Sequence, residues 1–354
     1  MHCGYCFYRD VSSRREVASL GHMSRETLQR LVRRAFSYAD GSVNFAFQGG
    51  EPTLAGLDFF EELVSLQKKY NTRGLAVSNS VQTNGYDVSD ELISLFAREH
   101  FLIGVSLDGD RQTHDLMRPD HAGHPTWDRI RATIARMKQA GCDVNILTVV
   151  NRHVARRPRQ VWDALASYEY LQFIACLDDF DGPPAPHSLT CEDYGRFLIE
   201  TFDLYQKAFF AGRPVSVRNF DNYLGILLGQ PPENCAMRGQ CGVYYLVEAD
   251  GSVYPCDFYV LDEFRLGNVN EDSFHRLAAS PVGEHFRAMS HTPHPDCKKC
   301  PYAFLCRGGC RRDREPLGAD CTHLNRFCAA YQAFFAACLP KMQEMAQALA
   351  ARSR

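Results

Sequence analysis

The chain has 354 residues, and its 39 lysines and arginines against 42 aspartates and glutamates give a formal net charge of −3. That balance argues against a general nucleic-acid binder, which normally carries a basic surplus. Hydrophobic residues make up 45% of the chain and charged residues 23%, a composition typical of a globular protein and not of a disordered one. No apolar run approaches the roughly 20 residues that cross a bilayer, and the first residues lack the pattern of a secretory signal. The expected compartment is therefore the cytoplasm, with no membrane partner.

The N-terminal half of the chain alternates amphipathic segments with short runs rich in Val, Ile and Phe. Apolar residues spaced three and four apart predict helices at 25–38, 57–70, 88–100, 127–140 and 158–168. The β-branched and aromatic runs between them predict strands at 43–47, 75–83, 101–107, 144–150 and 171–177. Repetition of strand and helix predicts a parallel sheet, either open or curled into a barrel.

Three of the predicted strands end in polar turns that contain glycine. These turns are Gln-Gly-Gly-Glu-Pro at 48–52, Gln-Thr-Asn-Gly at 82–85 and Ser-Leu-Asp-Gly at 106–109. In parallel α/β folds the functional loops follow the carboxyl ends of the strands. We therefore expect the active face at this end of the sheet.

The character of the sequence changes near residue 233. Residues 190–229 have a helical pattern, which Pro231-Pro232 ends. From Asn234 onward Cys, Gly, Pro and Asp stand in short elements, until a final helical stretch from about His323 to Leu349. We therefore predict two domains, 1–233 and 234–354.

Cysteine is unusually frequent, with 15 residues in a chain that shows no export signal. Clustered thiols in that setting indicate metal rather than disulfides. Cys3 and Cys6 form a C-x-x-C pair, which is a weak signal by itself. A second group of eight is stronger, because eight thiolates complete two [4Fe–4S] clusters or two zinc sites, and their spacing does not choose between iron and zinc. The eight are Cys235, Cys241, Cys256, Cys297, Cys300, Cys306, Cys310 and Cys328.

The other cysteines and the nearby histidines have simpler interpretations. Cys321 competes with Cys328 as the last ligand of the second group. His291 and His294 are expected to be loop residues, because the eight cysteines already complete both sites. Four cysteines stand singly in apolar or amphipathic settings and are expected to be packing residues: Cys142, Cys176, Cys191 and Cys338.

Taken together, these residues resemble the anaerobic sulfatase-maturating enzymes, which are radical S-adenosylmethionine proteins with a SPASM-type C-terminal domain. The resemblance lies in Cys-Gly-Tyr-Cys-Phe-Tyr at 3–8, Phe-Ala-Phe-Gln-Gly-Gly-Glu-Pro-Thr-Leu at 45–54, Val-Ser-Leu-Asp-Gly at 105–109 and the cysteines from 235 to 328. It covers nearly the whole chain in the order of the family. It implies an α/β fold, a partial (β/α)6 barrel whose first strand is missing, followed by a small cysteine-rich α+β domain.

The resemblance also implies iron rather than zinc, in three [4Fe–4S] clusters. Cys3 and Cys6 would hold the cluster that binds S-adenosylmethionine, and the group of eight would hold two auxiliary clusters. The family motif is C-x-x-x-C-x-x-C, so the first cysteine and the first barrel strand are expected upstream of Met1. We interpret this as a start assigned too late, because the chain as given lacks one ligand and one core strand.

The resemblance implies a role for each matching site residue. Tyr5 and Leu177 would contact the adenine of S-adenosylmethionine. The backbone of Gly49-Gly50 would meet its methionine amino group, where glycine permits close approach. Ser106 and Arg118 would hold its ribose and carboxylate ends.

Asp257 directly follows the expected ligand Cys256 and matches the general base of the family. It would remove the thiol or hydroxyl proton while a 5′-deoxyadenosyl radical takes a β-hydrogen from a cysteine or serine, which becomes formylglycine. The implied partners are an unfolded sulfatase precursor with a C/S-x-P-x-R type motif and an electron donor such as flavodoxin or ferredoxin. Asp178, Asp179 and Asp181 are either attractors of the substrate arginine or solvated loop acids.

Two other functions remain open from the sequence. One is a radical maturase that makes a thioether or carbon–carbon crosslink in another peptide, since such enzymes share the SPASM domain. The other is a non-enzymatic zinc-binding interaction protein.

Overall fold

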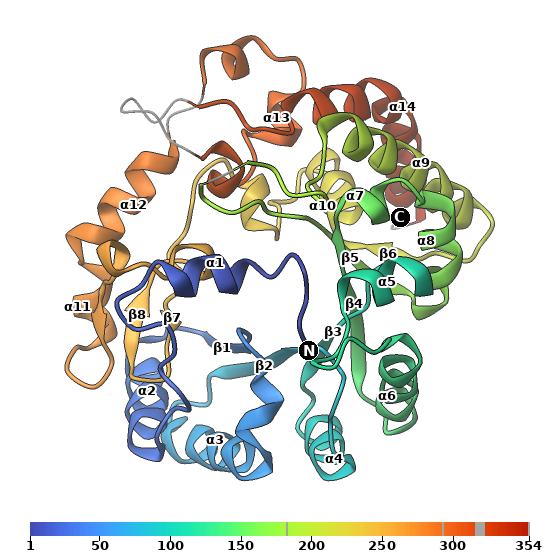
Figure 1. The fold of residues 1–354 in the computed structure, drawn as a ribbon. Coiled ribbons are helices and arrows are strands. Elements are labelled where there is room, and N and C mark those ends of the chain that lie inside the picture. The colour runs from blue at the N-terminus through green and yellow to red at the C-terminus, as the bar shows by residue number, and fades with distance from the viewer. Residues whose placement is uncertain (182, 292–293, 316–322, 353–354) are drawn as a thin grey trace.

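Six parallel strands form one sheet in the order β1-β2-β3-β4-β5-β6. The computed structural model describes residues 1–181, 183–291, 294–315 and 323–352. Each strand lies beside its neighbour in sequence, so the helices that connect them collect on one face and surround the arc of strands in Figure 1. The strands are β1 (Ser42–Phe47), β2 (Ala76–Thr83), β3 (Leu102–Ser106), β4 (Asp143–Val150), β5 (Tyr170–Ala175) and β6 (Ser216–Val217).

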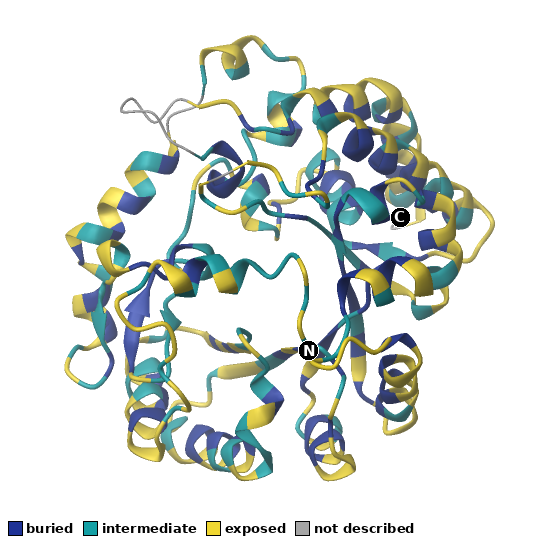
Figure 2. Cartoon of the chain, in the orientation of Figure 1, coloured by how far each residue is buried: buried dark blue, intermediate teal, exposed yellow. Residues whose placement is uncertain are grey.

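The five predicted strands and five predicted helices of the N-terminal half are confirmed, with ends that differ by a few residues. Amphipathic faces explain the helices: Phe60, for example, is fully buried and makes edge-on ring contacts with Phe96 and Phe101 inside the sheet–helix core. The helices are α2 (Arg25–Tyr38), α3 (Leu57–Tyr70), α4 (Asp90–Arg98), α5 (Arg111–Met117), α6 (Trp127–Gln139), α7 (Arg152–Ala155) and α8 (Pro158–Leu165). Figure 2 shows their buried sides turned toward the strands.

One strand was missed by the sequence analysis. The region 190–229, predicted as helical throughout, contains α9 (Cys191–Phe210), then β6, then α10 (Arg218–Leu227). β6 pairs Ser216 with Tyr170 and Val217 with Leu171. Two residues are too few to show a strand period, so only the neighbouring strand reveals this element.

Residues after 233 begin with short elements, as their composition predicts. A small antiparallel sheet of β7 (Leu246–Val247), β8 (Ser252–Tyr254) and β9 (Gly267–Asn268) lies beside the barrel. Helices α11 (Phe274–Ala278), α12 (Pro281–His291) and α13 (Ala303–Cys306) follow it.

The predicted C-terminal helix is confirmed as α14 (Cys328–Arg352), and it packs along α9 and α10 of the barrel. Phe334, Cys338 and Met342 on this helix belong to the same buried core as the barrel strands. Gly195 of α9 permits the close approach, since a Cβ there would lie 3.3 Å from the Cα atom of Ala330. The last helix thus joins the C-terminal part of the chain to the barrel core.

Of the four single cysteines, Cys142, Cys176 and Cys338 are buried, as expected of packing residues. Cys191 is half-buried, and its thiol donates to the carbonyl of Arg326 at 3.4 Å. Among the described helices, none combines the length and the apolar character that a bilayer crossing requires.

Candidate active site

The C-x-x-C loop lies at the carboxyl end of the sheet. The amide of Gly4 donates to the carbonyl of Met117 at 2.9 Å, and that of His2 donates to Pro119 at 3.0 Å. Cys6 then begins helix α1 (Phe7–Ser13) as its N-cap residue. Two backbone hydrogen bonds therefore fix the loop of Cys3 and Cys6 beside the segment that carries Arg118.

Two consecutive glycines follow β1 in a backbone conformation that favours glycine. Gly49 has φ +90° and Gly50 has φ +57°. A Cβ on Gly49 would lie 3.6 Å from the ring of Tyr8, which comes from α1. A Cβ on Gly50 would have nothing within 4 Å, so the backbone of this turn is open there to close approach by a ligand.

Glu51 fastens this turn to the next strand end. Its carboxylate accepts hydrogen bonds from the Thr83 hydroxyl at 2.7 Å and from the amide of Asn84 at 2.7 Å. It also accepts from the hydroxyl of Thr53 at 2.7 Å. The loops after β1 and β2 are thereby held as one unit.

The remaining expected cofactor contacts stand at the same edge of the sheet. Ser106 is the last residue of β3, and Leu177 follows β5 by two residues; both are half-buried. Arg118 ends α5, is buried, and donates to the phenol oxygen of Tyr5 at 2.7 Å. The Nε of Arg118 is buried without a hydrogen-bond partner among the described residues. A ligand acceptor would satisfy this N–H group.

Asp257 reaches the barrel from the C-terminal part of the chain. It opens a short 3-10 turn, Asp257–Tyr259, that packs against α1. Its carboxylate accepts a hydrogen bond from Nε2 of Gln48, directly before the glycine pair, at 3.0 Å and one from the Cys256 thiol at 3.3 Å. Burial raises the pKa of Asp257, although both hydrogen bonds oppose the shift. The carboxylate thus lies against the edge where β1 ends.

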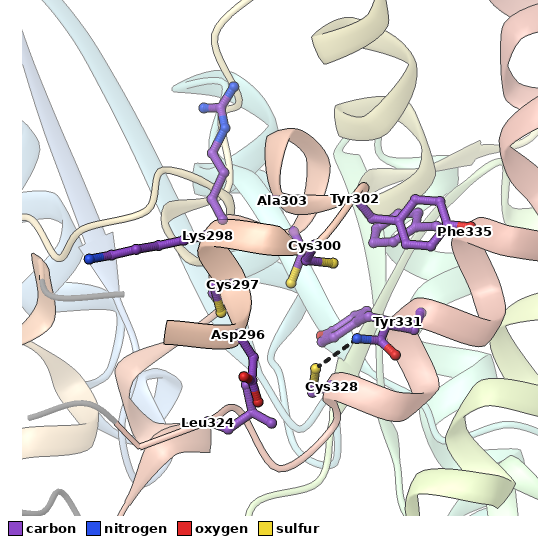
Figure 3. Close-up of a pocket in the computed structure, with 14 residues that line it drawn as sticks. Asp296, Cys297, Lys298, Cys300, Tyr302, Ala303, Leu324, Cys328, Tyr331 and Phe335 are labelled. Atoms are coloured by element: carbon purple, nitrogen blue, oxygen red, sulfur yellow. Dashed lines mark hydrogen bonds between the residues drawn. The ribbon is translucent and has the colours of Figure 1, made fainter. Parts of the chain in front are cut away.

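The eight C-terminal cysteines separate into two groups of four. The members of one group lie close enough to shift each other's pKa. Burial raises the pKa of the Cys310 thiol, and the nearby thiols of Cys235 and Cys241 raise it further. Burial also raises the pKa of Cys256, and Cys310 adds to that rise. The other group lines a single cavity of about 240 Å³ (Figure 3), and its members are Cys297, Cys300, Cys306 and Cys328.

The donor chemistry of the cavity fits an iron–sulfur cluster, which takes four cysteine thiolates. Within the described ranges, no three His, Cys, Asp or Glu side chains converge as a single metal ion requires. Neither His291 nor His294 lines the cavity; His294 instead accepts from the amide of Asp296 at 3.2 Å. Cys328 lines it, whereas Cys321 lies outside the described residues.

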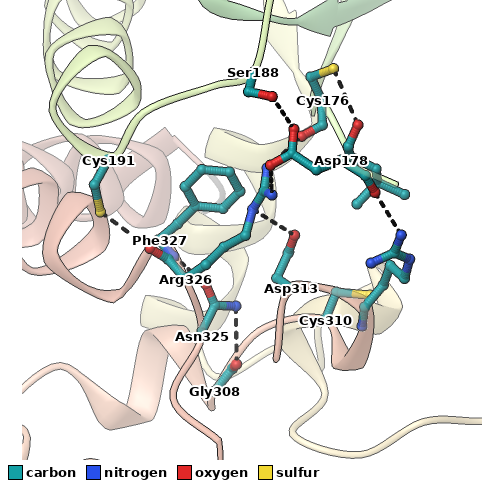
Figure 4. A network of polar contacts seen from close by, with 12 residues as sticks. Cys176, Asp178, Ser188, Cys191, Gly308, Cys310, Asp313, Asn325, Arg326 and Phe327 are labelled. Carbon is teal, nitrogen blue, oxygen red and sulfur yellow. Dashed lines mark hydrogen bonds and ion pairs between the residues drawn. The ribbon is translucent and has the colours of Figure 1, made fainter. Parts of the chain in front are cut away.

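A network of polar contacts centred on Arg326 joins the barrel to the cysteine-rich part (Figure 4). Arg326 pairs with the carboxylate of Asp178 and donates to the carbonyl of Cys176 at 2.8 Å. Asp178 also accepts from the hydroxyl of Ser188 at 2.5 Å. Its backbone carbonyl accepts from Arg312 at 2.6 Å.

Two of the three loop acids after β5, Asp178 and Asp181, are therefore engaged within the chain, whereas Asp179 is exposed. Asp178 is held by Arg326, and Asp181 pairs with Arg14 at 2.7 Å. The expectation that these acids are simply solvated does not describe Asp178. Sequence reasoning missed Arg326 and Gln48 as contributors, and only the position of Gln48 beside the glycine pair could have drawn attention to it.

Comparison with known proteins agrees with this geometry. The family model described as Radical SAM superfamily matches residues 1–159, and that of SPASM, an iron–sulfur cluster-binding domain, matches residues 235–301. The cysteine-type anaerobic sulfatase-maturating enzyme of Clostridium novyi is 42% identical over 99% of this chain and 95% of its own length. The serine-type enzyme of Klebsiella aerogenes is 29% identical over 98% of this chain and 84% of its own.

Solved structures show the same similarity in three dimensions. The structure titled native anSMEcpe with bound AdoMet and Kp18Cys peptide superposes with a TM-score of 0.93 at 39% identity, covering 98% of this chain and 95% of that one. SuiB of Streptococcus suis superposes with a TM-score of 0.60 at 14% identity, covering 93% of this chain and 72% of that one. The second likeness shows a shared fold only.

Proposed function

The chain belongs to the anaerobic sulfatase-maturating enzymes, within the Radical SAM superfamily, and from this premise we propose that it oxidises a side chain of a sulfatase precursor to formylglycine. The observation that carries the proposal is the contact between Gln48 and Asp257. It joins a carboxylate from the cysteine-rich part to the barrel edge that bears the expected cofactor contacts. A base and a cofactor site thereby meet at one place.

The residues of the barrel edge fit S-adenosylmethionine. We propose that Cys3 and Cys6 hold the cluster that binds it and that the open backbone of Gly49-Gly50 receives its amino group. Ser106 and Arg118 would hold its ribose and carboxylate ends. The Nε of Arg118, for which the described part of the chain supplies no acceptor, can donate to a carboxylate.

The adenine would lie between side chains from two separate loops. We propose Tyr5 and Leu177 as its contacts, since both stand at the carboxyl edge of the sheet. When bound, the reduced N-terminal cluster with S-adenosylmethionine supplies the hydrogen-abstracting radical, and the auxiliary clusters supply an electron acceptor.

The oxidation removes one hydrogen atom, one proton and one electron from the target side chain. The β-carbon gives up one hydrogen atom, Asp257 takes the thiol or hydroxyl proton, and one electron leaves as the C=S or C=O bond forms. A serine thereby becomes the aldehyde directly. For a cysteine, water then replaces the sulfur and hydrogen sulfide leaves.

We propose cysteine as the preferred target residue. The cysteine-type relatives are 42% and 39% identical to this chain, whereas the serine-type relatives are 29% identical. The substrate would be an unfolded sulfatase segment of the C-x-P-x-R type, and a one-electron carrier such as flavodoxin or ferredoxin would be the electron donor.

Three clusters are proposed in all, one at Cys3 and Cys6 and two at the groups of four. We further propose that the barrel ends and the cysteine-rich domain begins near residue 233, and that the enzyme works in the cytoplasm, where thiols stay reduced. The zinc alternative is set aside, because the matching C-terminal family model is an iron–sulfur one. A crosslinking maturase remains the rival, and the experiment below separates it.

The test uses the full-length gene product, reconstituted anaerobically with iron and sulfide and given S-adenosylmethionine, a reductant and a C-x-P-x-R peptide. We expect an aldehyde that a hydrazide probe captures. Asp257→Asn should lower the rate of aldehyde formation by about 100-fold or more, which is the usual contribution of a general base. The iron content should not change. Glu263→Gln is the matched control and should keep full activity, because this carboxylate is exposed and lies in the following 3-10 turn, Asp262–Phe264. Formation of 5′-deoxyadenosine with an unchanged or crosslinked peptide would overturn the proposal.

A further inference from the structure

A buried acid that the proposed mechanism does not use lies behind the C-x-x-C loop. Asp108 follows β3 by two residues and is fully buried. One carboxylate oxygen accepts from the amide of Val149 in β4 at 2.9 Å. The other accepts from the hydroxyl of Tyr5. The carboxylate therefore ties the loop to the middle of the sheet.

Arg118 completes the arrangement from the opposite side. Its Nη1 donates to the same phenol oxygen of Tyr5 at 2.7 Å and lies 4.0 Å from the carboxylate of Asp108. Tyr5 is thus the bridge between a buried cation and a buried anion. A buried charge is stable only when it is paired and hydrogen-bonded, so each of the three groups depends on the other two.

A second chain of hydrogen bonds joins Asp108 and Arg118 through their backbones. The amide of Asp108 donates to Nδ1 of His114 at 3.1 Å. Burial, with a contribution from Arg118, lowers the pKa of His114 to about 3, so the ring is neutral and its proton is on Nε2. Nε2 then donates to the hydroxyl of Thr126 at 3.0 Å, and that hydroxyl donates to the carbonyl of Arg118 at 2.7 Å. Every donor in this ring has an acceptor.

We propose that Asp108 is a positioning residue for S-adenosylmethionine, acting through Tyr5 and Arg118. The inference rests on the proposed function, which makes those two residues cofactor contacts. Asp108 fixes the position of the Tyr5 phenol and pairs with the charge of Arg118. The Nε of Arg118, which has no hydrogen-bond partner among the described residues, thereby remains available to the cofactor. Asp108 itself is fully buried, so it would act on the cofactor only through these two residues.

The experiment measures the equilibrium affinity of the reconstituted full-length enzyme for S-adenosylmethionine, together with its iron content. Asp108→Asn keeps the shape but removes the anion, and we expect affinity to fall about 30-fold, since a hydrogen bond to a charged group is lost within a buried set. Tyr5→Phe removes only the hydroxyl that joins Asp108 and Arg118, and we expect the affinity to fall about 10-fold. The double variant should be no weaker than Asp108→Asn alone, because both changes break one unit.

Asp128→Asn is the control, because this exposed carboxylate pairs with Arg111 on the surface; its affinity should match the wild type. Wild-type affinity in Asp108→Asn, or full additivity of the two losses, would overturn the inference. If Asp108→Asn fails to retain iron, Tyr5→Phe decides the matter by itself, and wild-type affinity there overturns the inference. A wild-type enzyme that binds S-adenosylmethionine yet makes no aldehyde defeats the proposed function while leaving this test intact.

Discussion

The barrel and the cysteine-rich part both place function on loops, but they hold those loops in different ways. In the barrel the turns that follow β1, β3 and β5 leave a continuous parallel sheet over a large buried core. In the C-terminal part three strands of two or three residues lie over small apolar clusters, such as the one of Val253, Val269, Phe274 and Leu277. We therefore expect side-chain packing to stabilise the barrel. We expect the bound clusters to stabilise the cysteine loops.

Arginines provide part of the support that the C-terminal core lacks. Arg311 is buried with its guanidinium 4.6 Å from the ring centres of both Tyr259 and Phe286. Arg312 lies 3.7 Å above the ring of Phe180, in the loop after β5. Stacked cations of this kind stabilise most where they are withdrawn from water. They tie the cysteine loops to the barrel without a large apolar interface.

The largest expected effect follows from removing iron. Chelation should raise amide hydrogen exchange in the cysteine loops between 235 and 310 by about 100-fold or more, equivalent to roughly 2.7 kcal/mol of lost local stability. Strands β1 to β5 should change little. Exchange measured by mass spectrometry on the holo and apo forms checks this, and equal acceleration in both regions would break the comparison.

The next effect probes the barrel. Phe60→Ala should lower the free energy of unfolding of the barrel by about 3–5 kcal/mol, because a fully buried ring is replaced by a cavity. Iron content per folded chain should stay the same. Phe210→Ala is the control, since that ring is 48% exposed and its loss should cost less than about 1 kcal/mol. Loss of iron from Phe60→Ala at a temperature where the chain is folded would show that the stabilities of the two regions are coupled.

A smaller effect concerns the link between the regions. Arg326→Gln removes the ion pair with Asp178. We expect the free energy of unfolding to fall by only about 1–2 kcal/mol, because the pair is partly exposed. Asp181→Asn breaks only the pair with Arg14, at a carboxylate that is 82% exposed, and leaves the Arg14–Asp10 pair in place, so it should cost under about 0.5 kcal/mol. Urea titrations of both variants test the difference. Equal losses would mean that the Arg326 network adds nothing beyond a surface pair.

The smallest effect is a dependence of stability on pH. The pKa of His114 is lowered to about 3 by burial and by Arg118, while Asp108 and Thr126 face the ring through hydrogen bonds. The unfolded chain binds a proton here below about pH 6.5 and the folded chain does not, so stability falls as pH drops below that value. His114→Asn should flatten the slope between about pH 5.5 and 6.5 by about 1 kcal/mol per pH unit. An unchanged slope would show that this ring is not the titrating group.

The two regions also differ in how much their sequence predicts. Helix and strand periods predicted a parallel sheet, and the family resemblance predicted that it forms a barrel. The polar turns at 48–52, 82–85 and 106–109 predicted the active edge. The short sheet of β7 to β9 has no period to detect, and β6 exists only because β5 lies beside it. Cysteine spacing predicted the number of sites but not which thiols share one. Gln48 and Asp108 lie in turns that the sequence singled out, but their partners, like those of Arg326, are far away in the chain. No local pattern could therefore predict these contacts.

The most direct test of the proposed activity follows the hydrogen that leaves the substrate. The full-length enzyme would receive S-adenosylmethionine, reductant and a C-x-P-x-R peptide whose target cysteine carries deuterium on its β-carbon. The account predicts deuterium in 5′-deoxyadenosine, one deuterium left on the aldehyde carbon, and release of hydrogen sulfide. Deuterium in 5′-deoxyadenosine with sulfur retained in a crosslinked peptide would contradict it.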